Sequence, residues 1–152
     1  MPRLRPDWSQ VREFTWPVEG TYEGIVLSDE EHAKEVLVDE ESELWEVRFR
    51  VKLVRCRDRE DGKIVLDTEK REVVDTLEIG VSLPTSGPMA WRLQEFLRVL
   101  GYGRSGKVDE VDTNDWHGKR VVLKVVKGVS KKTGREYTTV RFVGRAREEA
   151  AV

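Results

Sequence analysis

The chain has 152 residues, of which 37% are charged and 38% apolar, and its formal net charge is −2. This length suits one domain with a real core, and the aliphatic content argues against disorder. A single cysteine, Cys56, excludes an intramolecular disulfide and a cysteine-based zinc cluster. With two histidines in the whole chain, a histidine-rich metal site is excluded as well, so we expect no metal and no cofactor.

No apolar run is long enough to span a bilayer, and the N-terminus lacks a signal-peptide pattern. We therefore expect a cytoplasmic protein that does not bind membranes. The abundance of Glu, Lys and Arg beside few Cys and Met is typical of thermophile proteins. We divide the chain into an N-terminal arm packed on the domain (1–17), one domain (18–147) and a short tail (148–152).

The first predicted element is a strand over Gly20–Leu27, with a kink or bulge at Gly24. The acidic stretch Asp29–Glu46 follows, in which Lys34 is the only Lys or Arg, and we interpret it as a long solvated loop. It either serves solvation alone, or repels duplex DNA or mimics it to compete for a basic surface.

Leu44–Arg55 is the clearest strand, because apolar and charged residues alternate without a fault across nine of its residues. The expected core face comprises Trp45, Val47, Phe49, Val51 and Leu53. The opposite face is mostly cationic and comprises Glu46, Arg48, Arg50 and Lys52.

Lys63–Ile79 predicts either one long strand or two shorter strands joined by a bulge around 68–71. A helix is expected over Pro88–Leu100, with Thr85 or Ser86 as its cap and Gly101 or Gly103 at its end. Its apolar stripe is Met89, Leu93, Phe96, Leu97 and Leu100. Trp91 lies on the opposite side of this helix, either covered by the N-terminal arm or exposed as a partner contact.

The last third of the chain predicts two strands, Lys119–Lys127 and Arg135–Val143, joined by a tight turn at 131–134. From His117 to Arg147 there are ten Lys or Arg residues against the single Glu136. Since the whole chain is nearly neutral, positive charge is concentrated on this hairpin, which favours a polyanion-binding surface.

The predicted order is three strands, a helix and two strands. This is the order of the OB-fold, a five-stranded Greek-key barrel that binds oligonucleotides or oligosaccharides, with its helix closing the open end of the core. We therefore expect an all-β domain with one helix.

From about Gly20 to Val143 the chain also resembles the phage-encoded OB-fold single-stranded-DNA-binding proteins. The segments that carry the likeness are GTYEGIVL, WEVRFRVKL, WRLQEFLRVLGYG and HGKRVVLKV with TGREYTTV. The resemblance implies an OB-fold and single-stranded DNA as the ligand, in replication or recombination.

Binding of single strands without sequence preference needs cations for phosphates and aromatic faces for bases. Alternate residues on a strand lie roughly 6.5–7 Å apart, close to the repeat of an extended nucleotide backbone. The predicted phosphate contacts are Arg48, Arg50, Lys52, Arg120, Lys124, Lys127, Lys131, Lys132, Arg135 and Arg141. Tyr137 and Trp116 are predicted to stack on bases, although Trp116 could instead cover the end of the barrel.

The sequence predicts a binding protein and not an enzyme. The carboxylates near Asp112 lack the spacing of a calcium loop, and the glycine-rich stretch GYGRSGK lacks that of a P-loop. The alternative to DNA binding is a β-barrel adaptor whose Trp91 and acidic loop contact a replication or host-takeover protein. RNA in place of DNA stays open, as do oligomeric state and a partner in replication or recombination.

Overall fold

The computed structural model of the protein describes residues 15–103, 106 and 110–145. Most of the predicted N-terminal arm, and the whole predicted tail, lie outside this range. The end of the arm is held to the domain, because Trp16 packs against the core and Pro17 forms a β-bridge with Leu66.

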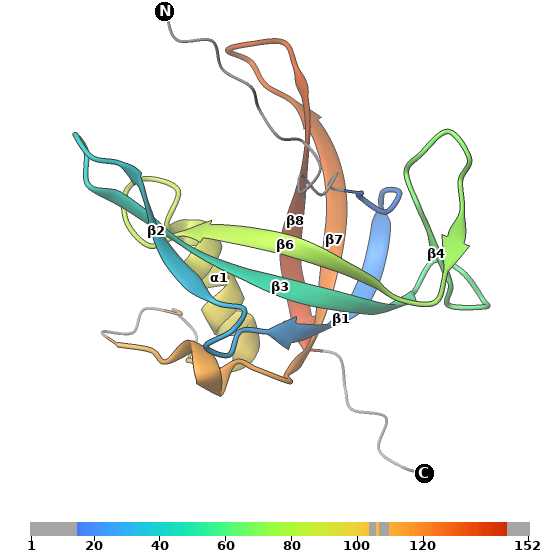
Figure 1. The fold of residues 1–152 in the computed structure, drawn as a ribbon, viewed down its shortest axis with the longest axis horizontal. Helices are drawn as coiled ribbons and strands as arrows, with labels where there is room; N and C mark the ends of the chain where they lie inside the picture. Colours follow the sequence, from blue (N-terminus) through green and yellow to red (C-terminus); the bar gives the residue numbers. More distant parts are fainter. Residues whose placement is uncertain (1–14, 104–105, 107–109, 146–152) are drawn as a thin grey trace, which may run out of the picture.

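The described residues form mainly antiparallel β-structure with one α-helix (Figure 1), which confirms the predicted class. The large sheet contains β1 (Gly20–Leu27), β2 (Lys34–Asp39), β3 (Leu44–Cys56), β6 (Leu77–Pro84), β7 (Arg120–Val129) and β8 (Glu136–Arg145). A separate ladder joins β4 (Ile64–Val65) to β5 (Val73–Val74). The α-helix α1 (Trp91–Leu100) lies between β6 and β7 in the chain, and a 3-10 turn spans Thr113–Asp115.

The long strand β3 is the centre of the sheet. It pairs with β6 along one edge, and with β1 and then β2 along the other. The sheet continues from β1 to β7 and β8. In Figure 1 the β3–β6 pair crosses in front of the β7–β8 pair. Within the described residues β6 and β8 do not pair, so the sheet is open and lacks the predicted closure into a barrel.

A bulge in β1 allows the sheet to bend. The register between β1 and β3 shifts between Glu23 and Gly24, as the sequence predicts. A Cβ atom at Gly24 would lie 2.5 Å from Cγ1 of Val51, so only glycine permits this close approach of the two strands.

The acidic stretch after β1 is not wholly a loop, and this part of the sequence interpretation is wrong. Its middle forms β2, which pairs with the first half of β3 from Lys34 opposite Arg48 to Asp39 opposite Leu44. The physical reason is that β3 extends beyond the end of β1 and needs a second partner for its backbone groups. The apolar run from Val36 to Val38 supplies residues that suit a strand.

The region from 63 to 79 also differs from both predicted alternatives. It forms the short strands β4 and β5, separated by a turn in which Arg71 has a positive φ of 48°. The third long strand is β6, which continues to Pro84 and buries Ile79, Val81 and Leu83. The turn interrupts the periodicity, so the predicted long strand is replaced by a small hairpin followed by β6.

Helix α1 begins at Trp91, later than predicted, with Ala90 at its N-cap and no side-chain capping bond. The predicted caps Thr85 and Ser86 are therefore wrong, since they lie six and five positions before the first helical residue. The helix ends as predicted at Gly101, whose φ of 99° is the left-handed conformation that glycine favours. Phe96, Leu97 and Leu100 of the predicted stripe are buried, whereas Met89 lies before the helix and is 47% exposed, so its predicted place in the stripe is wrong.

An aromatic cluster fastens the helix to the sheet. Phe96 of α1 contacts Phe49 of β3, Phe142 of β8 and Trp116, with ring centroids 5.0, 4.6 and 5.2 Å away. Trp116 is 1% exposed, so the prediction that it stacks on bases is wrong and its alternative role of covering the core holds. Trp45 is 40% exposed, which contradicts its predicted place in the core, because β3 extends past the helix there.

These two tryptophans give the first prediction. Trp116→Ala removes a fully buried ring and should lower the free energy of unfolding by about 3–5 kcal/mol. Trp45→Ala removes a half-exposed ring and should cost about 1 kcal/mol or less, because much less apolar area returns to water. Urea unfolding of both variants measures the difference. Equal losses would contradict the assignment of Trp116 to the core.

Candidate nucleic-acid interface

The outer face of β3 carries the cations that the sequence assigns to it. Arg48, Arg50 and Lys52 alternate with the buried residues of the strand. Across the sheet they lie opposite Ser82, Gly80 and Glu78 of β6. The structure therefore confirms the predicted position of these cations on the outer face of β3.

A hollow of about 530 Å³ lies on this face where the loop between β1 and β2 meets β3 and β6. Its lining comprises His32, Lys34, Arg48, Phe49, Arg50, Gly80, Val81 and Ser82. Four of these residues have basic side chains, which suits an anionic ligand. His32 and Lys34 are not among the predicted contacts, because the acidic stretch is predicted to be a solvated loop. The sequence signal for a strand here is the apolar run Val36–Val38.

The two arginines of the hollow already have acidic neighbours. Nε of Arg48 donates to Oε1 of Glu46 at 2.5 Å. Nε of Arg50 forms an ion pair with Oε1 of Glu78 at 2.6 Å, without a hydrogen bond from this Nε. By contrast, Lys34 and Lys52 have no carboxylate partner within the described residues. A phosphate near the arginines would therefore compete with Glu46 and Glu78.

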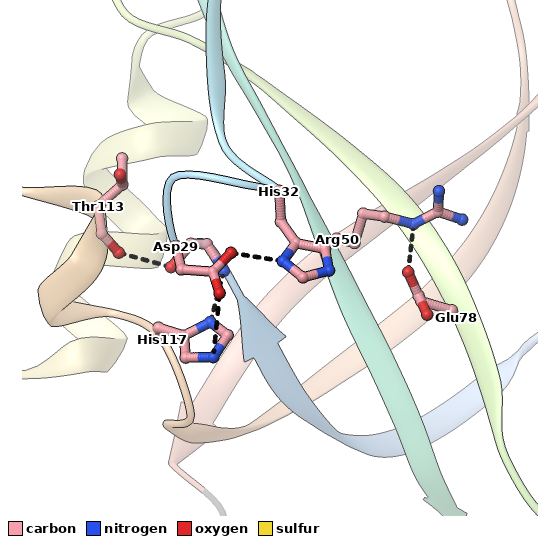
Figure 2. Close-up of polar contacts among 7 residues, drawn as sticks. Asp29, His32, Arg50, Glu78, Thr113 and His117 are labelled. Atoms are coloured by element: carbon pink, nitrogen blue, oxygen red, sulfur yellow. Dashed lines mark hydrogen bonds and ion pairs between the residues drawn. The ribbon is translucent and has the colours of Figure 1, made fainter.

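The loop from β1 to β2 is held beside the hollow by two histidines and a carboxylate. Figure 2 shows Asp29 between the rings of His32 and His117. Nδ1 of His32 lies 2.5 Å from Oδ1 of Asp29, and this hydrogen bond lowers the pKa of the Asp29 carboxyl. The Ser28 amide donates to Nδ1 of His117, whose Nε2 lies 3.7 Å from Oδ2 of Asp29.

The same loop places donor atoms of Asp29, Glu31 and His32 within 4.8 Å of one another. Such a group could hold a divalent cation. Because Nδ1 of His32 is already bonded to Asp29, the contacts are satisfied internally, and we assign no metal to them. Through these contacts the cluster joins the β1–β2 loop to His117, at the edge of the hollow.

The β7–β8 hairpin extends beyond the rest of the sheet, since the pairing of β1 with β7 ends at Val125 (Figure 1). We call residues 126–139 the basic arm. Its cations Lys131, Lys132 and Arg135 are exposed and have no carboxylate partner within the described residues. The turn closes at Gly134, which has a positive φ of 68°, as the sequence predicts.

Tyr137 supplies the arm with an aromatic ring. It is 50% exposed and lies opposite Gly128, where a Cβ atom would come within 2.5 Å of its Cζ and hydroxyl oxygen. Gly128 thus leaves room for the ring to reach across β7. Tyr137 follows Arg135 by two residues in the chain, so the arm carries both an exposed ring and cations, the two groups that base stacking and phosphate contact require.

The remaining predicted phosphate contacts differ in their exposure and in whether a carboxylate already pairs with them. Lys124 is exposed on the outer face of β7, whereas Arg120 is half-buried. Lys127 forms an ion pair with Asp67, and Arg141 is bound by both carboxylate oxygens of Glu95 at 3.0 and 2.7 Å. The predicted contacts at Lys127 and Arg141 are thus engaged in holding the β4–β5 turn and α1.

Trp91 at the start of α1 is 41% exposed, and the guanidinium of Arg141 lies 4.9 Å from its ring centroid. Its ring therefore has a cation on one side. The predicted cover by the N-terminal arm falls on residues outside the described range.

Comparison with protein-family models and with curated proteins gave no match to this chain. In the described part of the chain, no helix has both the length and the apolar character needed to cross a bilayer. Function must therefore be inferred from the chemistry of the surface itself.

The loop contact gives the second prediction. In His32→Ala the pKa of the Asp29 carboxyl should rise toward its ordinary value, because the hydrogen bond to the carboxylate is lost. A depressed folded-state pKa stabilises the fold above the ordinary carboxyl range, and this stabilisation is lost as pH falls through the depressed value. Carbon-detected NMR titration measures the shift. The carboxyl of Asp61, with a pKa lowered to about 2 mainly by the side-chain hydrogen bond from Arg59, is the control that should not move.

Proposed function

We propose that the chain is a non-catalytic protein that binds single-stranded DNA without sequence preference and acts in replication or recombination. The observation that carries the proposal is the basic arm. Lys131, Lys132 and Arg135 present positive charge that no described carboxylate neutralises, and Tyr137 of the same arm is 50% exposed. Phosphate contacts and base stacking are the two requirements for such binding.

We also propose that the fold is an OB-fold opened between β6 and β8. In support, β6, β3, β1, β7 and β8 follow one another across the sheet, and α1 lies between the third and fourth of the long strands in the chain. OB-folds are partly open barrels that bind oligonucleotides on the face of their second and third strands and on two flanking loops. In this chain those parts would be β3 and β6, the loop from β1 to β2 beside the hollow, and the turn of the basic arm.

On this proposal the hollow beside β3 is a second contact for the single-stranded DNA. Lys34 and Lys52 would attract phosphates directly. Arg48 and Arg50 would contribute once a phosphate replaces Glu46 and Glu78 as their partner, so their net contribution is smaller. Exposed ion pairs of this kind are worth about 0–1 kcal/mol, so a bound phosphate can replace the carboxylate at a small cost in free energy.

The third prediction tests the basic arm by anisotropy of a fluorescent oligo-dT across a salt series. The unmodified protein should bind at low salt and weaken steeply as salt is added. In Lys131→Glu/Lys132→Glu/Arg135→Glu the affinity should fall at least about tenfold, and the slope of log affinity against log salt should decrease by about 2, since three phosphate contacts are lost.

A matched control reverses three exposed cations elsewhere, in the variant Lys63→Glu/Lys70→Glu/Arg98→Glu. It has the same net charge as the arm variant and should keep most of the affinity. Equal losses in both variants would mean that only the overall charge matters. A parallel titration with oligo-rU decides between DNA and RNA.

The fourth prediction concerns the carboxylates beside the hollow. Glu46→Gln/Glu78→Gln removes two anions from the proposed phosphate path and should tighten oligo-dT binding by about two- to tenfold. Glu69→Gln/Glu72→Gln, which changes two exposed carboxylates near β5, is the control and should have little effect. Unchanged affinity in the first variant would mean that the DNA binds at the basic arm alone and not at the hollow.

A second candidate function is a protein–protein adaptor, as the exposure of Met89 and Trp91 favours. The oligo-dT titration separates the two. If no binding occurs even at low salt, the adaptor function takes precedence, and a pull-down comparing the unmodified protein with Trp91→Ala tests it.

A further inference from the structure

The β2–β3 hairpin carries a charge opposite to that of the basic arm. Its turn contains Asp39, Glu40, Glu41 and Glu43, all of them exposed. Leu37, Val38 and Trp45 flank these acids and are exposed as well. We call residues 37–45 the acidic hairpin.

Within the described residues, no Lys or Arg neutralises the charge of the acidic hairpin. None of its carboxylates forms an ion pair with a described Lys or Arg. The Asp39 carboxylate accepts from the backbone amide of Glu41 at 3.0 Å, and hydrogen bonds from Ser42 and this amide lower its pKa. The Asp39 carboxylate is therefore held in its charged form on the surface of the turn.

The two hairpins also share a pattern of apolar residues. Val129 and Tyr137 are exposed on the basic arm beside its cations, as Val38 and Trp45 are beside the acids. Contacts that join a small apolar surface to complementary charges are typical of specific protein interfaces. The two hairpins are therefore opposite in charge, and both expose apolar side chains.

One copy of the chain does not bring the two together. Figure 1 shows the turns of the acidic hairpin and the basic arm projecting away from the body of the protein at separate places. No hydrogen bond or ion pair joins them within the described residues. A net charge of −2 gives little overall repulsion between two copies, so a contact between molecules is electrostatically open.

We propose that the acidic hairpin of one copy docks on the basic arm of a second copy. The contact joins two different surfaces and is therefore head-to-tail. Such an interface builds either a ring, in which every hairpin is engaged, or an open chain, which leaves one free hairpin of each charge at its ends. The proposal concerns the protein without nucleic acid and is independent of the proposed function.

The fifth prediction tests this contact by sedimentation velocity of the full chain without nucleic acid. At low salt the unmodified protein should form species larger than a monomer. At about 1 M salt, where the Debye length is about 3 Å, it should be monomeric. A monomer at both salt concentrations would overturn the proposal.

Charge reversal makes the test specific. Glu40→Lys/Glu41→Lys and Lys131→Glu/Lys132→Glu should each weaken self-association at least about tenfold, because like charges then face each other. Mixing the two variants in equal amounts should restore association, since both the original and the reversed pair of hairpins become complementary. Glu69→Lys/Glu72→Lys is the control and should associate like the unmodified protein.

The outcomes separate this proposal from DNA binding. Glu40→Lys/Glu41→Lys should lose self-association while it still binds oligo-dT, because the basic arm is intact. Circular dichroism of each variant establishes that the fold is kept. Association that survives either reversal, or a mixture of the two that stays monomeric, would refute the head-to-tail contact.

Discussion

The pairing of β3 with three other strands is the constraint on which the rest of the structure depends. β6 occupies one of its edges, and β1 and β2 share the other. Because both edges are occupied, the side chains of β3 have only two directions, into the core or out to the surface. This single strand therefore sets the position of Phe49 in the core and of Arg48 and Arg50 on the outer face.

The open edge of the sheet explains the place of the helix. With β6 and β8 unpaired, apolar surface between them would face water. Helix α1 contacts both strands, and Phe96 joins the aromatic rings of β3 and β8. Arg92 adds hydrogen bonds to the Thr139 hydroxyl and the Val140 carbonyl oxygen. The helix thus covers apolar side chains and also satisfies a backbone group at the edge of β8.

Charge is distributed over this scaffold in two ways. Near the body of the domain, cations are paired with carboxylates, as in Arg50 with Glu78 and Arg141 with Glu95. At the tips of the two long hairpins, charges of one sign gather without an opposite partner in the described chain. Paired charges hold local geometry, whereas unpaired charges remain available for a ligand or a second molecule. This contrast is the physical basis of both proposals.

Features that depend on neighbours along the chain can be predicted from the amino-acid sequence alone. Alternation in β3 predicted its buried and outward faces, and Gly101 and Gly134 marked the ends of a helix and a turn. The cationic hairpin was also evident, because its charges are close in sequence. These predictions succeed since strand and helix periodicity is a local property.

Only the tertiary structure decided which residues meet. Trp45 is in phase with the core and yet half exposed, since β3 extends past the elements that would cover it. Trp116 is buried because α1 and β3 bring their phenylalanines to it, and Lys127 is engaged because the β4–β5 turn places Asp67 beside it. Strand β2 exists because β3 needs a partner where β1 ends. Burial and charge pairing depend on contacts between distant segments, which periodicity along the chain does not encode.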